Sequence, residues 1–179
     1  KTGTLTTGRL TVARLAPAAG VGPSELLQLT ASAEKYSNHP VAKALLALAS
    51  EASVEVTEPE DFQETAGRGV RARVGGHDVV VGREVWLREM GLLVGEAAGA
   101  DLRESEGYSL LFVARDGVAL GWIGFQDQRR VEAGEAIGAL RHLGIQRIAM
   151  VTGDRRRVAE RIAQEVGCQE VCADCLPQD

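Results

Sequence analysis

The chain has 179 residues, of which 45% are hydrophobic and 25% charged, and its formal net charge is −5. The length allows one large or two small domains, and the composition is typical of a globular protein and favours neither a disordered nor a fibrous chain. The negative charge provides no general basic field for nucleic acid or anionic lipid. No window approaches the ~18 continuous apolar residues of a membrane span, and no signal peptide is seen, so we expect this chain to be soluble.

The first third of the chain predicts a strand followed by two helices. Residues 5–17 alternate apolar and polar side chains, as a strand does. A helix is expected over 24–37 with Ser24 as its N-cap. A second is expected over 39–52, with Pro40 in its first turn, where a missing N–H does no harm. The short segment between them is a tight junction.

The middle of the chain has the pattern of an antiparallel sheet. Residues 69–82 form two short alternating runs around a glycine pair, and 109–125 form two more around an Asp-Gly turn. Such pairs indicate hairpins. A further helix is expected over 95–107. Helices packed on an antiparallel sheet make residues 9–125 an α+β unit.

The last part of the chain alternates helix with apolar strand. We expect helices over 131–144 and 155–167, and strands over 145–154 and 169–174. This alternation predicts a parallel, Rossmann-like sheet, with ligands bound at the carboxyl ends of its strands. The pattern stops midway at "LPQD", so we expect an incomplete domain over 126–179.

Two loops suit phosphate binding. In "IAMVTGD" an apolar strand ends at Thr152 and Gly153 directly before a helix, whose N-terminus offers unpaired N–H groups. In "KTGTLTTG" small hydroxyl residues surround a glycine behind Lys1, and such a loop can wrap a phosphoryl group. Alone, the first loop is usually a plain turn and the second a Thr-rich strand. Both loops in one chain favour phosphate chemistry.

The three cysteines, Cys168, Cys172 and Cys175, are odd in number and crowded near the end of the chain. A secreted disulfide framework would spread an even count, so a reducing compartment is expected. Their spacing matches one used by three-cysteine iron-sulfur sites. Cys172, however, alternates with apolar residues as a small buried hydrophobe would, and a structural role is favoured over a metal site.

Five segments together resemble the heavy-metal-transporting P-type ATPases. "KTGTLTTG" is similar to the segment after the phosphorylated aspartate, whose signature is D-K-T-G-T-L-T. "TGD" followed by "LPQD" resembles the phosphorylation domain of the family. "SNHP" resembles the S-x-H-P element of the nucleotide-binding domain, and "GRGV" and "VVVGREVWL" resemble its glycine elements. All five occur in the family's order over nearly the whole chain.

The resemblance implies a fold of the α/β class with a discontinuous domain. An α+β nucleotide-binding domain, residues 9–125, would be inserted into a partial Rossmann-like, haloacid dehalogenase-like phosphorylation domain made of residues 1–8 and 126–179. Asp127 would mark the hinge between the two, with Arg130 as its companion. A surface ion pair of ~0 to 1 kcal/mol is the simpler alternative for these two residues.

The resemblance also implies the catalytic residues. The aspartate that attacks the γ-phosphate of ATP would stand immediately before the first residue of this chain. The residues implied around the phosphate are Lys1, Thr2, Thr152, Gly153 and Asp154. Thr2 would also bind Mg²⁺ through its backbone carbonyl. Arg155 stands where the family usually has asparagine, which leaves the role of that position open.

The adenine site is implied by a second set of residues. These are Glu34, His39, Gly67, Gly69 and Gly82. The glycines at 67 and 69 would let the backbone approach the nucleotide, which a Cβ would obstruct. For His39 the alternative is a helix-capping histidine beside Pro40.

The expected function is therefore the cytoplasmic ATP-binding and phosphorylation region of an integral membrane pump. With ATP and Mg²⁺ it would couple ATP hydrolysis to export of a transition metal such as copper or zinc. Its partners would be the membrane-spanning and actuator domains of the same parent protein and the metal ion bound there, with no nucleic acid. One alternative is a soluble haloacid dehalogenase-like phosphohydrolase with a large cap. Another is a nucleotide-binding regulatory module without activity of its own.

Overall fold

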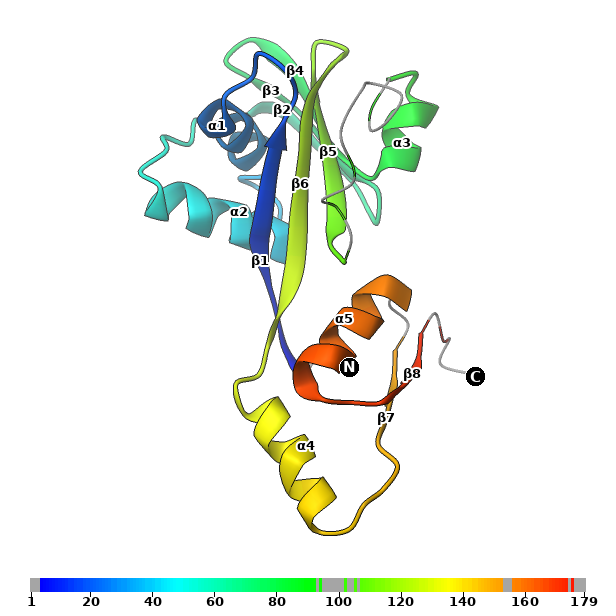
Figure 1. The fold of residues 1–179 in the computed structure, drawn as a ribbon. Coiled ribbons are helices and arrows are strands. Elements are labelled where there is room, and N and C mark those ends of the chain that lie inside the picture. Colours follow the sequence, from blue (N-terminus) through cyan, green and yellow to red (C-terminus); the bar gives the residue numbers. More distant parts are fainter. Residues whose placement is uncertain are drawn as a thin grey trace. The chain divides into compact units, whose positions relative to one another are not determined.

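The computed structural model describes residues 4–92, 94, 102, 105, 107–152, 156–173 and 175. Figure 1 shows the elements in chain order. The chain divides into two compact units. The parallel-sheet unit consists of Lys1–Arg9, Glu106–Tyr108 and Asp127–Asp179, and the antiparallel-sheet unit consists of Leu10–Ser105 and Ser109–Gln126. In the described part of the chain, no helix has the length and apolar character needed to cross a membrane.

A six-stranded sheet in the order β1-β6-β5-β4-β3-β2 lies mainly in the antiparallel-sheet unit, which does not include the first residues of β1 or the last residues of β6. Its strands are β1 (Thr6–Pro17), β2 (Glu60–Thr65), β3 (Gly69–Val74), β4 (His77–Gly82), β5 (Ser109–Arg115) and β6 (Val118–Arg129). The β3-β4 and β5-β6 hairpins turn at Gly75-Gly76 and Asp116-Gly117, where all four residues have positive φ. Two such residues in a row match the twist of an antiparallel pair. Both predicted hairpins are confirmed.

Two helices, α1 (Pro23–Ala33) and α2 (Pro40–Glu51), follow β1 and are joined by the expected tight junction. Both begin with proline, whose fixed φ suits the first helical position. The prediction that Ser24 caps α1 is wrong, because the N-cap is Gly22 and no side chain caps this helix. Pro23 occupies the position directly after this cap, so the cap lies two residues earlier than predicted.

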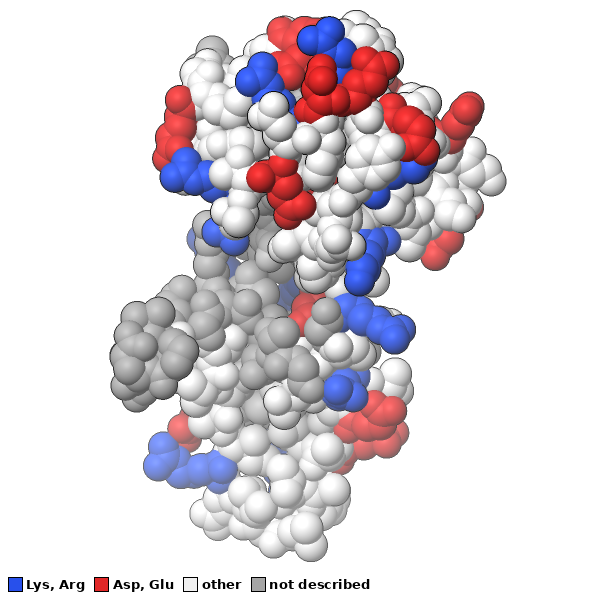
Figure 2. All heavy atoms as spheres, turned by 180° about the vertical axis from the view of Figure 1, so that it is seen from behind, with Lys and Arg blue, Asp and Glu red and all other residues white. Residues whose placement is uncertain are grey.

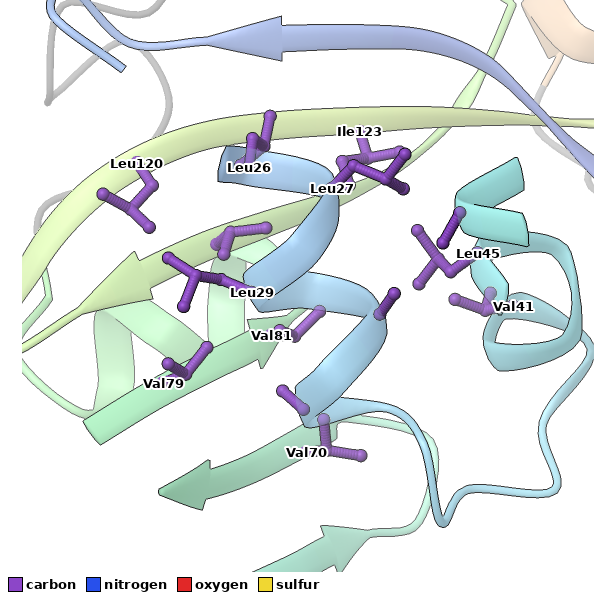
Figure 3. Packing of buried hydrophobic residues seen from close by; sticks show 14 of the residues in the cluster. Leu26, Leu27, Leu29, Val41, Leu45, Val70, Val79, Val81, Leu120 and Ile123 are labelled. Carbon is purple, nitrogen blue, oxygen red and sulfur yellow. The ribbon is translucent and has the colours of Figure 1, made fainter. Parts of the chain in front are cut away.

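The sheet has two apolar faces because successive side chains of a strand point to opposite sides. Val79 and Val81 pack in the cluster that contains Leu26 of α1, as Figure 3 shows. Val80, between them, belongs to a second cluster with α3 (Glu84–Glu89). This short helix was not predicted, since six residues are too few to display a helical period.

The parallel-sheet unit contains two strands and two helices. They are α4 (Glu132–His142), β7 (Ala149–Val151), α5 (Arg156–Val166) and β8 (Glu170–Cys172). β7 and β8 pair in parallel, which confirms the predicted sheet type, although each strand is only three residues long. Met150 packs with Ile137 and Ile162 between the strands and helices. Most of the helix expected over 95–107 lies outside the described residues.

Charges of both signs are interspersed on the face drawn in Figure 2, without a large basic patch. Several charged side chains of the described chain form ion pairs, among them Arg71 with Asp78 and Arg115 with Glu25. A surface of this kind agrees with the net charge of −5.

Candidate functional site

A pocket of about 220 Å³ opens in the antiparallel-sheet unit, where the α1-α2 junction meets the turn between β2 and β3. Its apolar walls are formed by Leu10, Val41, Val70, Leu110, Leu111 and Phe125. Its polar groups include Glu34, Ser37, His39, Glu64, Arg68 and Arg83. An apolar slot with a few polar groups is the usual form of a small-molecule site. Sites for whole drug-sized ligands measure about 300–1,000 Å³, so this one suits a single ring system of a larger ligand.

The α1-α2 junction is held by hydrogen bonds within the "SNHP" motif. Ser37 N donates to Glu34 O at 2.9 Å, and His39 N donates to Ser37 Oγ at 3.2 Å. His39 Nδ1 accepts from Val41 N at 3.2 Å and so caps α2. The capping alternative for His39 is confirmed, and the same side chain lines the pocket. Because Nδ1 accepts, the neutral ring carries its proton on Nε2, which leaves a donor for a ligand.

Glu34 lines the pocket, although the residue is only 4% exposed to solvent. Burial, followed by the nearby charge of Glu64, raises the pKa of Glu34 to about 7, while a hydrogen bond with Ser37 acts in the opposite direction. Its Oε2 has no hydrogen-bond partner among the described residues. A carboxyl of this kind accepts a hydrogen bond from a ligand N–H when ionised and donates one when protonated.

The three predicted glycines have different structural roles. Gly67 has φ 71° in the β2-β3 turn, with open space where a Cβ would be. Gly69 and Gly82 face each other across β3 and β4. A Cβ on Gly69 would lie 2.2 Å from Val81 O, and one on Gly82 would lie 2.5 Å from the Trp86 ring. Gly67 and Gly69 line the pocket, whereas Gly82 lies outside its lining and allows the indole to pack.

Ser37, Arg68 and Arg83 are among the polar pocket residues that were missing from the predicted site. Ser37 stands inside the "SNHP" motif, so the motif itself could have indicated it. Arg68 lies in the β2-β3 turn and forms an ion pair with Glu89. Arg83 follows β4, and no described residue forms an ion pair with it. No sequence signal other than its place after the last predicted glycine pointed to this arginine.

One predicted phosphate-loop residue, Thr152, falls within the described part of the chain. The others, which do not, are Lys1, Thr2, Gly153 and Asp154. Thr152 directly follows β7 and is 8% exposed. Its N–H donates to Cys172 O at 2.9 Å, and its carbonyl accepts from Cys175 N at 3.0 Å. Thr152 is thus anchored at the carboxyl end of a parallel strand, where ligands bind in such sheets.

The predicted hinge residues lie where the chain crosses between the two units. Thr6, which is fully buried, donates from Oγ1 to Asp127 Oδ2 at 2.5 Å. The other oxygen, Asp127 Oδ1, is buried with no hydrogen-bond partner in the described structure. Arg130 contributes its backbone N–H, which donates to Leu5 O at 2.9 Å. The hydrogen bond from Thr6 thus joins two residues that lie 121 positions apart in the chain.

The cysteines are not equivalent in the fold. Cys168 is buried, whereas Cys172 is exposed. The interpretation of Cys172 as a small buried hydrophobe is therefore wrong. Val171 of β8 packs against the core cluster, whereas Cys172 and Glu170, on the other face of the strand, are exposed. Among the described residues no group of three His, Cys, Asp or Glu side chains is arranged to hold a metal.

Comparison with known proteins gives matches over the whole chain. Residues 1–179 match the family model of haloacid dehalogenase-like hydrolases. The chain is 38% identical over 181 residues to "Probable copper-exporting P-type ATPase V" of Mycobacterium tuberculosis (strain CDC 1551 / Oshkosh), a match that covers 100% of this chain and 23% of that protein. The chain thus spans about a quarter of the length of the curated relatives it matches.

Solved structures share the fold. The crystal structure of a zinc-transporting PIB-type ATPase in the E2.Pi state matches with a TM-score of 0.77 and 34% identity, covering 100% of this chain and 29% of that one. A structure of the catalytic domain of the CPx-ATPase CopB-B, described for its conformational changes upon nucleotide binding, matches with a TM-score of 0.74 and 26% identity. That match covers 100% of this chain and 60% of the other. The α+β and haloacid dehalogenase-like fold expected from the sequence is confirmed.

Proposed function

The chain belongs to the haloacid dehalogenase-like hydrolases and, within them, to the heavy-metal P-type ATPases, and from this premise we propose that it is the ATP-binding and phosphorylation region of a metal-exporting pump. The observation that carries the proposal is the pocket that brings Glu34 and His39 together beside an apolar slot. The antiparallel-sheet unit would be the nucleotide-binding domain, over about residues 9–125. The parallel-sheet unit would belong to the phosphorylation domain, with residues 1–8 and 126–179.

Adenine fits the chemistry of the pocket. The ring is flat and apolar on its faces, which suits a slot walled by Leu111, Val70 and Phe125. Its exocyclic amine donates hydrogen bonds and its ring nitrogens accept them. In our proposal the ionised carboxylate of Glu34 accepts from the amine, and Nε2 of His39 donates to a ring nitrogen. Guanine has a carbonyl oxygen in place of the amine, which would face an acceptor-only carboxylate and disfavour binding above pH 7.

The rest of the nucleotide would extend past the pocket's rim. A pocket of about 220 Å³ leaves ribose and phosphates outside. Arg83 lines the pocket and has no ion-pair partner among the described residues, so it is the side chain we propose for contact with the phosphates. Gly67 and Gly69 provide backbone without side chains beside the same opening.

The phosphorylation chemistry is assigned to the two loops of the parallel-sheet unit. We propose that Lys1, Thr2, Thr152, Gly153 and Asp154 hold the transferring phosphoryl group, with Thr2 and Asp154 at the Mg²⁺ end. Mg²⁺, when bound, would neutralise charge on the phosphates, and these residues would position the phosphoryl group for attack by a carboxylate nucleophile. Thr152 supports this assignment because it is buried and anchored at the carboxyl end of β7.

The parent protein would be an integral membrane pump with this region on its cytoplasmic side. It would couple the aspartyl-phosphate cycle to export of a transition metal, in contact with its own membrane-spanning and actuator domains. Copper and zinc are the candidate cargoes, because relatives named for each match the whole chain. The soluble phosphohydrolase with a cap is not favoured, since these relatives and the solved structures are metal-transporting ATPases.

A substitution that keeps the helix cap tests the pocket. His39→Asn retains an oxygen that can accept from Val41 N, because asparagine is a good N-cap, but it removes the Nε2–H donor. We expect ATP affinity, measured by calorimetry, to fall roughly 5–30-fold, as the loss of one or two hydrogen bonds would produce. The melting temperature should stay near that of the unmodified chain.

His39→Ala is the matched control, because it removes both the cap and the donor. It should weaken ATP binding to a similar degree and also lower the melting temperature. Unchanged ATP affinity in His39→Asn would contradict the assignment of this pocket to adenine. Affinity for GTP equal to that for ATP at pH 8 would contradict the role of Glu34.

A further inference from the structure

Two cysteines at the end of β8 lie close enough to react with each other. Cys172 and Cys175 have the C-x-x-C spacing, and their Sγ atoms are 2.9 Å apart. Sulfurs joined in a disulfide are about 2.05 Å apart, so closure requires a shift of only about 0.9 Å. The exposed Cys172 is open to a small reagent, and Cys175 is partly exposed. An accessible cysteine beside a second, resolving cysteine is typical of redox-active sites.

We propose that Cys172 and Cys175 form a reversible disulfide by exchange with a low-molecular-weight disulfide such as oxidised glutathione. The Cys172 thiolate attacks one sulfur of the reagent, so that a mixed disulfide forms and one thiolate leaves. The Cys175 thiolate then attacks Cys172 Sγ, which closes the protein disulfide and releases the second thiolate. Two protein thiols lose two electrons and two protons, and the reagent becomes two thiols.

The third cysteine is a built-in contrast. Cys168 is buried, and burial raises the pKa of its thiol, although the positive charge of Arg141 acts in the opposite direction. A buried thiol with a raised pKa is a poor nucleophile. The same chain thus carries one cysteine protected by the fold and two held together at its surface.

The disulfide would act on the phosphate loop through the backbone. Cys172 O accepts from Thr152 N, and Cys175 N donates to Thr152 O, so the two cysteines together engage both backbone hydrogen-bonding groups of that residue. A ring closed between them restricts the segment that makes both bonds. Oxidation would therefore restrict the motion of Thr152. This effect is separate from the proposed nucleotide binding in the antiparallel-sheet unit.

Mass spectrometry of the 179-residue chain tests the proposal. After incubation with oxidised glutathione, the intact mass should fall by two hydrogen atoms, alkylation should find one remaining thiol, and the cross-link should map to Cys172 and Cys175. Reduced glutathione should restore both thiols. The rate of closure should exceed that of the chain in denaturant by about tenfold, because the fold holds the sulfurs together. Equal rates would overturn the claim that the fold prepares the pair.

Single substitutions separate the steps. Cys175→Ser should stop at glutathione attached to Cys172, whereas Cys168→Ser should behave as the unmodified chain does. Amide exchange in the peptide containing Thr152 should slow on oxidation, while peptides from α2 should not change. Two alkylatable thiols at Cys172 and Cys175 after oxidation would overturn the proposal. So would retention of both thiols together with binding of one equivalent of Ag⁺, which would make the pair a metal site.

Discussion

The two units differ in how completely they bury their apolar residues. In the antiparallel-sheet unit, Val79, Val113 and Ile123 are fully buried, because helices cover the sheet. In the parallel-sheet unit, Val151 in β7 is 60% exposed and Leu143, just after α4, is 80% exposed. Parallel sheets are normally covered on both faces, and the described strands of this unit are not. The proposed adenine pocket therefore lies beside an extensive buried core, whereas Thr152, of the proposed phosphate loop, follows a strand of a short two-stranded sheet.

The chain contains a probe that separates the two units. Both of its tryptophans, Trp86 and Trp122, belong to the antiparallel-sheet unit. Tryptophan fluorescence therefore follows unfolding of that unit alone, while circular dichroism follows both. A difference between the two signals during denaturation would show that the units unfold separately.

The largest effect on stability is expected at the cross-strand pair of Gly69 and Gly82. In Gly82→Ala the new Cβ would lie 2.5 Å from the Trp86 ring and 2.7 Å from Arg68 O, and the backbone oxygen cannot move aside cheaply. Overpacking of this kind should lower the free energy of unfolding, measured by fluorescence in denaturant, by about 3 kcal/mol.

The matched control for this change is Gly138→Ala in α4, where nothing lies within 4 Å of the new Cβ. It should stabilise its helix by about 0.5–1 kcal/mol without moving the fluorescence transition. If Gly138→Ala shifts that transition as much as Gly82→Ala does, the units fold as one, and the contrast between them is lost.

The next effect concerns Glu34 and depends on pH. Its pKa is raised from 4.5 to about 7, so the folded chain binds this proton more tightly than the unfolded chain does. The associated stability is present below pH 4.5 and is lost as pH rises through 7. Glu34→Gln has no charge to bury, and it should therefore be more stable than the unmodified chain by about 2 kcal/mol at pH 8 and nearly equal to it at pH 5.

Denaturation at both pH values measures this difference. Glu64→Gln provides a second variant, because Glu64 contributes to the raised pKa of Glu34. It should shift the loss of stability to lower pH. A stability difference for Glu34→Gln that is the same at pH 5 and pH 8 would show that the buried carboxyl is not the titrating group.

The smallest effect is expected at the crossing between the units. Thr6→Val removes the hydrogen bond to Asp127 and leaves a buried carboxylate with less compensation, which should lower the free energy of unfolding by about 1.5 kcal/mol. Thr7→Val is the neighbouring control, because Thr7 Oγ1 donates to Gln128 O at an exposed site. It should change stability by less than about 0.5 kcal/mol. Equal effects of the two substitutions would count against a special role for Thr6.

Local sequence patterns predicted most elements but not every boundary. The glycine pair and the Asp-Gly turn indicated the hairpins, because the tolerance of a residue for positive φ depends on its own side chain. Ser24 was assigned as a cap from its type alone, and the proline before it changed the start of α1. Cys172 was assigned to the interior because it lies between two apolar residues of a strand. Its side chain points to the opposite face from theirs, so it would be buried only in a sheet covered on both faces.

Only the part of the candidate site that is marked by local motifs was predicted. Glu34 and His39 were identified from their motif, and the structure places both at one pocket. Arg83 was missed, because its approach to that pocket depends on how β4 and α3 pack rather than on a pattern around it. The close pair of Cys172 and Cys175 could be suspected from spacing, but its contact with Thr152 could not.

The sequence by itself determined the family, the order of the motifs and the type of each sheet, since these depend on short-range spacing and on which residues suit a turn, strand or helix. Only the tertiary structure decided that Glu34 is buried with a raised pKa, that Thr6 and Asp127 meet, and that His39 both caps a helix and lines a pocket. The physical reason is that burial and electrostatic environment are set by segments far apart in the chain, whose approach no local pattern records.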